Sequence, residues 1–160
     1  MKKLFLLVVM ALTLSLAAQA QDVKTYENKA FKIDYPADWE VTWDSESFVN
    51  LASADEAITF DLSYNELGPK KSELQECVNN WTYMKENHGD KVDQKLVKED
   101  YALVRSIATD EEDGSQTVTV WYIMISREPE CFTGTINSPF DRANEAIDIL
   151  GNILATLSPK

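Results

Sequence analysis

The residues of this chain that could take part in catalysis are few and widely spaced. The sequence of 160 residues holds one histidine, His88, and two cysteines, Cys77 and Cys131. A Ser-His-Asp or Cys-His site would have to use His88, yet Cys77 lies about three turns away on the same predicted helix. We therefore interpret His88 as a residue at the C-terminal end of that helix, where the exposed carbonyls favour it.

Metal chemistry has one concentrated set of oxygen ligands available. Asp110, Glu111, Glu112 and Asp113 are consecutive and precede Gly114. Carboxylates suit hard cations, so this run could hold calcium weakly. Its spacing differs from that of an EF-hand loop, which places acids at alternate positions. The alternative interpretation is the solvated tip of a hairpin without a metal.

The two cysteines could form a disulfide, but the sequence does not require it. A bond between Cys77 and Cys131 would close a loop of about 54 residues and add about 4 kcal/mol in the chain-entropy model. The alternative is a pair of packed, reduced thiols, because spacing alone does not bring two Cα atoms together. There is no Cys-x-x-Cys motif for thiol exchange.

No other cofactor motif or catalytic set is present in the sequence. The chain has five glycines and no glycine-rich phosphate loop, and no pair of acids stands out as a hydrolase pair. We therefore expect a protein that is not an enzyme and that carries no cofactor. A hydrolase built on two carboxylates is the least favoured alternative.

The N-terminus predicts export. Lys2 and Lys3 precede an apolar run over residues 4–18, and Ala18 and Ala20 are small residues at the positions that a signal peptidase reads. We interpret residues 1–20 as a signal peptide and residues 21–160 as one domain. The apolar run is too short to span a membrane, and we expect no later span. A periplasmic location is expected, with release to the medium as the alternative.

The net charge of −12 restricts the partners of the exported domain. Nucleic acids and anionic membrane surfaces would be repelled, whereas basic protein patches and metal cations would be attracted. We expect the partner to be another protein of the bacterial envelope.

Periodicity predicts the elements that must position these residues. Residues 58–64 alternate most clearly, with Ile58, Phe60 and Leu62 on one face and polar residues on the other. Residues 117–126 are apolar on both faces, as in a central strand that is covered on both sides. Strands are predicted over residues 31–35, 40–43, 47–52, 58–64, 91–98, 101–109, 117–126 and 131–136, and helices over residues 72–89 and 138–157. Connections of the hairpin kind predict an α+β fold: a mainly antiparallel sheet of about six to eight strands, flanked by a mid-chain and a C-terminal helix.

Aromatic residues are the remaining candidates for binding. Trp39 and Trp81 are predicted to fill the core. Trp43 lies next to Asp44 near the end of a strand, and we predict it as a ligand-binding residue that lines a groove.

The segment Phe31-x-Ile33-x-Tyr35-Pro36-x-x-Trp39-x-Val41 resembles the opening strand pair of the PsbP/Mog1-like superfamily. This superfamily includes photosystem accessory proteins, a nuclear-transport cofactor and small exported bacterial proteins. The resemblance implies an antiparallel sheet flanked by helices, and a binding or accessory role. It carries over no catalytic or ligand residue. The sequence thus predicts an exported, non-enzymatic accessory or protein-binding domain of the bacterial envelope, with a small-ligand or divalent-cation binding module as the alternative.

Overall fold

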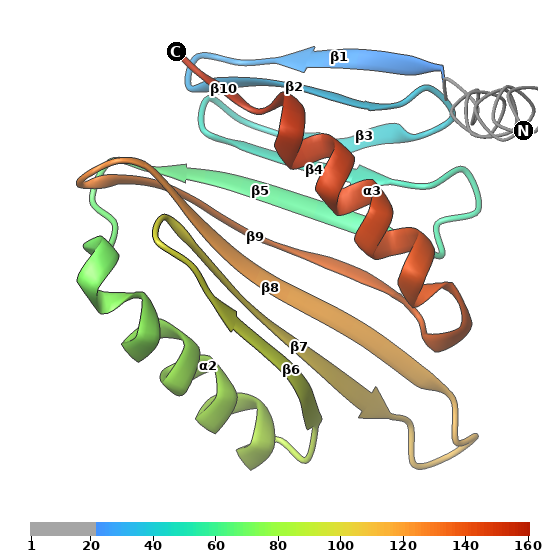
Figure 1. The fold of residues 1–160 in the computed structure, drawn as a ribbon. Coiled ribbons are helices and arrows are strands. Elements are labelled where there is room, and N and C mark those ends of the chain that lie inside the picture. Colours follow the sequence, from blue (N-terminus) through green and yellow to red (C-terminus); the bar gives the residue numbers. More distant parts are fainter. Residues whose placement is uncertain (1–21) are drawn as a thin grey trace, which may run out of the picture.

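Ten strands and two α-helices make up residues 22–160, which are the part of the chain described by this computed structural model (Figure 1). The predicted signal peptide, residues 1–20, lies outside the described residues. The strands are β1 (Val23–Glu27), β2 (Phe31–Pro36), β3 (Glu40–Asp44), β4 (Phe48–Ala52), β5 (Thr59–Asn65), β6 (Lys91–Val97), β7 (Tyr101–Thr109), β8 (Gln116–Arg127), β9 (Glu130–Pro139) and β10 (Ser158–Pro159). The helices are α2 (Leu74–Asn87) and α3 (Ala143–Thr156), each preceded by one 3₁₀ turn, Lys71–Glu73 and Phe140–Arg142.

The strands form two antiparallel sheets. Seven strands pair in the order β3-β4-β5-β9-β8-β7-β6, and β1, β2 and β10 form a second sheet of three. The predicted α+β fold with two flanking helices is therefore confirmed. The sequence did not predict β1 or β10, because β1 has one buried residue among five and β10 is two residues long.

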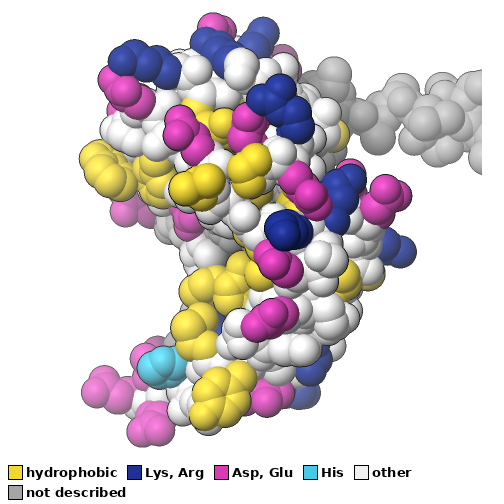
Figure 2. Space-filling model, turned by 90° about the vertical axis from the view of Figure 1, so that its left-hand side faces the viewer, with side chains coloured by type: hydrophobic (Ala, Val, Ile, Leu, Met, Phe, Trp, Pro, Cys, Tyr) yellow, Lys and Arg dark blue, Asp and Glu magenta, His cyan; other side chains and the backbone are white. Residues whose placement is uncertain are grey.

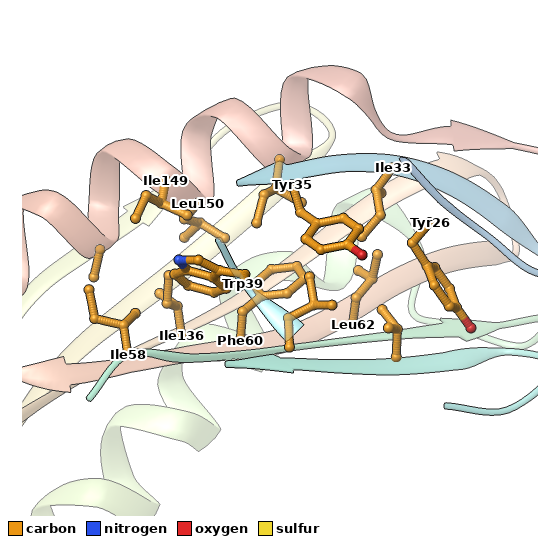
Figure 3. Close-up of a cluster of buried hydrophobic side chains, with 14 of the residues drawn as sticks. Tyr26, Ile33, Tyr35, Trp39, Ile58, Phe60, Leu62, Ile136, Ile149 and Leu150 are labelled. Atoms are coloured by element: carbon orange, nitrogen blue, oxygen red, sulfur yellow. The ribbon is translucent and has the colours of Figure 1, made fainter. Parts of the chain in front are cut away.

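The main core lies between α3, the three-stranded sheet and one face of the seven-stranded sheet. Trp39 is 2% exposed, as predicted, and packs with Ile149 and Leu150 of α3. Figure 3 shows these two helix residues above Trp39, with Phe60 of β5 below. The apolar face of residues 58–64 thus points into this core.

The second helix, α2, packs on the opposite face of the seven-stranded sheet. Its buried residues Leu74 and Val78 contact a smaller cluster from β7, β8 and β9: Ala102, Val104, Ile123, Ile125 and Cys131. Strand β8 is therefore buried on both faces, as predicted from residues 117–126. Trp81 was predicted to fill the core, but it is only half-buried at the margin of this cluster.

Two glycines show how the helices end and pack. Helix α2 stops at the exposed His88, as predicted, and Gly89 follows with a φ of +87°, a conformation that glycine adopts without strain. Gly151 of α3 is not required for close packing on the sheet, because a Cβ at this position would have no atom within 4 Å.

Helix α2 covers only part of its sheet face. It contacts β6 and β7, at one end of the seven-stranded sheet, whereas β3, β4 and β5 lie at the other end. The space-filling view shows the outline hollowed between the upper part of the molecule, with β1 to β4, and the lower part, with α2 (Figure 2). Neither described helix is long and apolar enough to cross a membrane.

Candidate functional site

The uncovered part of the sheet and the side of α2 enclose a groove of about 320 Å³, which we call the α2 groove. It is lined from β5, α2, β8 and β9 by Asp61, Ser63, Trp81, Trp121, Tyr122, Thr133, Gly134 and Thr135. One of these residues is an acid, four carry a hydroxyl group, and two are tryptophans. A concave surface of this kind, with apolar walls and a few placed polar groups, is typical of a binding site.

Strand alternation explains why polar side chains face the groove. On β5, Phe60 and Leu62 are buried in the main core, so the intervening Asp61 and Ser63 point to the opposite face. Strand β9 pairs with β5 so that Asp61 lies opposite Thr135 and Ser63 lies opposite Thr133. Cross-strand pairing therefore places these four polar residues together on the floor of the groove.

Hydrogen bonds fix this floor. The Thr135 backbone N–H donates to Asp61 Oδ1 at 3.1 Å, and the Thr135 hydroxyl donates to Asp61 Oδ2. Asn65 Nδ2 donates to Thr133 Oγ1 at 3.0 Å. The side chains are thus held in place before any ligand arrives, which lowers the entropy cost of binding.

Asp61 is half-buried and has no basic partner among residues 22–160; its two carboxylate oxygens are bonded only to Thr135. Burial raises the pKa of the Asp61 carboxyl, and the two hydrogen bonds from Thr135 offset part of that effect. The groove therefore holds a carboxylate that lacks a positive charge beside it.

Tyr122 and Gly134 support Asp61 from beneath. Tyr122 is buried, and its hydroxyl donates to the Asp61 backbone carbonyl at 2.8 Å. Burial holds the pKa of Tyr122 well above its usual value, so the hydroxyl stays protonated and remains a donor. A Cβ at Gly134 would lie 2.0 Å from the Asp61 carbonyl oxygen and 2.5 Å from Tyr122 Oη, so only glycine fits here.

Two indole rings form the opposite wall. Trp81 of α2 and Trp121 of β8 have ring centroids 6.0 Å apart at 56°. Lys85 Nζ lies 5.2 Å from the centroid of Trp121 and also pairs with Asp90 at 3.0 Å. The face of Trp121 thus already accommodates one cation.

Trp43 does not line the α2 groove. It lies on β3, the edge strand of the seven-stranded sheet, and is 64% exposed. Its ring packs on Phe48, with centroids 4.8 Å apart. Its role as a ligand-binding residue stays a prediction, but the structure places it on an open edge.

The four acids predicted to bind calcium are exposed at the β7–β8 turn. Asp110 Oδ1 accepts from the Glu112 N–H at 2.7 Å, and Asp113 Oδ1 accepts from the Ser115 N–H at 2.8 Å. Among the described residues, no three His, Cys, Asp or Glu side chains converge to hold a metal ion. The calcium site at these four residues stays a prediction, and at least two of the carboxylates already accept hydrogen bonds from the backbone of their own turn.

Cys77 and Cys131 are free thiols in this structure, which is the second of the two alternatives that the sequence allowed. Cys131 is buried beneath α2, while Cys77 is half-buried on the helix itself. Burial raises the pKa of both thiols, which keeps them protonated and poorly nucleophilic.

The comparisons with known proteins find similarity in structure. No protein-family model matches the chain, and a search of curated proteins finds no match. The structure of the Ran-binding protein Mog1p of Saccharomyces cerevisiae aligns over 87% of this chain and 96% of its own, with a TM-score of 0.62 and 10% identity. This likeness confirms the PsbP/Mog1-like fold that residues 31–41 predicted.

Two further structures match less well. Cyanobacterial PsbP of Synechocystis aligns over 90% of this chain and 96% of its own, with 10% identity and a TM-score of 0.49. A crystal structure from Bacteroides thetaiotaomicron aligns over 84% of this chain with 17% identity and a TM-score of 0.49. The chain spans only 49% of the length of that protein.

Proposed function

We propose that this chain is a non-enzymatic protein-binding domain that is exported and assists another protein of the bacterial envelope. The α2 groove is its binding surface. The observation that carries the proposal is the half-buried Asp61, which is held by Thr135 and lines the same groove as two tryptophans. Ordered polar groups beside half-buried aromatic rings are typical of surfaces that recognise another protein.

Two further observations support the proposal. The Ran-binding protein Mog1p has the same fold, although at 10% identity this is an analogy of fold and not of site. Residues 1–20 have the pattern of a signal peptide, which supports export. An envelope partner follows from the proposed compartment.

The experiment is cross-linking in the native cells, followed by affinity purification of the tagged protein and mass spectrometry. We expect one envelope protein in near-stoichiometric amount. Two variants test the groove: Trp81→Ala removes one wall, and Ser63→Arg places a long cationic side chain next to Asp61. Tyr83→Ala is the matched control, because Tyr83 is on the same helix but is 71% exposed and does not line the groove.

Thermal melting of each variant separates loss of binding from loss of folding. If the partner is lost with Trp81→Ala and Ser63→Arg but kept with Tyr83→Ala, the groove is the binding surface. If the protein is recovered alone in every case, or if all three variants keep the partner, the proposal is wrong.

One observation favours a second candidate function, the binding of a small apolar ligand. A cavity of about 400 Å³ lies beside α3 and is lined largely by apolar residues: Tyr101, Leu103, Tyr122, Ile123, Met124, Ile147, Leu150, Gly151, Leu154 and Ala155. The probe is anilinonaphthalene sulfonate. Fluorescence enhancement by the native protein that is lost in Gly151→Leu would support this function, and no enhancement would refute it.

A further inference from the structure

We infer that the α2 groove binds a basic side chain, lysine or arginine, of the partner protein, with its cationic end at the Asp61 carboxylate. This inference rests on the proposed function and names the chemistry of the partner at that same site.

Two other acids with largely buried side chains, Asp90 and Asp93, have basic partners, whereas Asp61 has none among the described residues. Asp90 pairs with Lys85 at 3.0 Å, and Asp93 pairs with Arg105 through two hydrogen bonds of 2.6 and 2.8 Å. Asp61 has only the hydrogen bonds from Thr135. A carboxylate that is withdrawn from water without a countercharge is destabilised, and a cation at this point would restore it.

The tryptophans in the walls of the groove also suit a cation. Ammonium and guanidinium groups are attracted to the faces of indole rings. Trp81 and Trp121 both line the groove and offer such ring surface. The alkyl stem of an incoming lysine or arginine would cover apolar ring surface while its charged end reaches Asp61.

Hydroxyl groups in the groove and the negative charge of the chain also favour a cation. Ser63 and Thr133 lie opposite each other on β5 and β9 at the floor of the groove, where their hydroxyls can accept the N–H groups that Asp61 does not. The chain carries a net charge of −12, which attracts a basic segment and repels an acidic one. A volume of about 320 Å³ suits one long side chain, while the rest of the partner stays outside.

The test uses the purified protein and three blocked tripeptides, Ac-Ala-X-Ala-NH2, in which X is lysine, norleucine or glutamate. Binding is followed by chemical-shift changes of the backbone amides in NMR spectra and by tryptophan fluorescence. We expect the lysine peptide to shift the amides of Asp61, Thr133 and Thr135, and the other two peptides to leave them unchanged.

The decisive variant is Asp61→Asn, which keeps the shape of the side chain and an oxygen for the Thr135 N–H while removing the charge. We expect it to weaken binding of the lysine peptide at least about tenfold, because hydrogen bonds between charged partners are roughly twice as strong as those between neutral groups. Glu76→Gln on the exposed surface of α2 is the matched control and should bind as the native protein does.

Three results would overturn the inference: equal binding of the norleucine peptide, preferred binding of the glutamate peptide, or unchanged binding by Asp61→Asn. The two proposals fail differently. If the native partner is lost with Trp81→Ala but kept with Asp61→Asn, the groove binds a protein and the basic side chain is wrong. If no partner is recovered at all while the lysine peptide still binds at Asp61, the envelope role fails and the cation site stands.

Discussion

Replacement of Gly134 by alanine is the sharpest test of how the fold builds the α2 groove. A Cβ at this position would lie 2.0 Å from the Asp61 carbonyl oxygen and 2.5 Å from Tyr122 Oη. Non-bonded heavy atoms prefer about 3.5–4.0 Å. Neither neighbour can move freely, because the carbonyl belongs to the sheet backbone and Tyr122 is buried. The alanine can be accommodated only if β5 and β9 separate, because turning the Tyr122 ring away would leave the clash with the Asp61 carbonyl.

The cost of Gly134→Ala has two parts. Overpacking in a tight interior costs about 1–3 kcal/mol. Loss of the 2.8 Å hydrogen bond from Tyr122 to Asp61 leaves a buried hydroxyl without a partner, which costs about 1–3 kcal/mol more. We therefore expect the free energy of unfolding to fall by about 2–6 kcal/mol, a large part of the 5–15 kcal/mol of a typical domain.

The assay for Gly134→Ala is urea unfolding followed by circular dichroism and tryptophan fluorescence, with unchanged m-values as the sign of a two-state comparison. Tyr122→Phe is the matched control, since it removes the hydroxyl without adding a Cβ. The cost of Gly134→Ala should shrink in the Tyr122→Phe background, because one of the two clashes is gone. A Gly134→Ala variant within about 0.5 kcal/mol of the native protein, the usual range of neutral surface changes, would refute the reasoning.

The remaining predictions concern stability, pH, metal and thiols. Gly151→Ala should raise the free energy of unfolding by about 1 kcal/mol in urea unfolding, because this helical Cβ meets no atom within 4 Å; a loss would show a hidden contact. Burial raises the folded-state pKa of Asp61, so the stability that Asp61 contributes is lost as pH rises through that pKa; Asp61→Asn should gain stability relative to the native protein from about pH 4 upward, and melting temperatures that stay parallel across pH would contradict this. Calcium should leave the melting temperature unchanged, whereas a clear rise would show that residues 110–113 bind the ion. Thiol titration of the unfolded, unreduced protein should find Cys77 and Cys131 both reactive, and no reaction would indicate a disulfide.

Much of the fold could be predicted because the local periodicity of apolar residues indicates the strands and helices. Residues 58–64 alternate apolar and polar over a full strand, and one face of that strand can only be core. The burial of Trp39 followed from the strand, turn and strand around it. Strand β1 could not be predicted, because a mostly exposed strand is specified by its pairing with β2 and not by its own pattern.

The site could not be predicted because it depends on which strands a helix covers. The alternation of residues 58–64 assigned Asp61 to a polar face, but the register that sets it opposite Thr135 is a property of the pairing of β5 with β9. Trp81 has the spacing of a core residue on α2, yet it lies at the margin of the covered area and is half-buried. The run of four acids at residues 110–113 was conspicuous in the sequence, but Asp110 and Asp113 accept hydrogen bonds from the backbone of their own turn.

The width of the sheet explains why a groove exists at all. Neighbouring strands are about 4.8 Å apart, so a sheet of seven strands is about 29 Å wide, whereas a helix with its side chains is about 10–12 Å across. One helix can therefore cover two or three strands, and α2 contacts β6 and β7. On the other face, α3 and the three-stranded sheet together cover the core.

The strands beyond the reach of α2 must present polar side chains to water, and Asp61 and Ser63 do so. A groove at the boundary between covered and uncovered strands thus follows from the architecture, whereas what it binds follows from the few side chains at that boundary. The fold shared with Mog1p at 10% identity is a likeness of architecture, and Asp61 and Trp81 are the side chains whose replacement should change binding while the sheet stays intact.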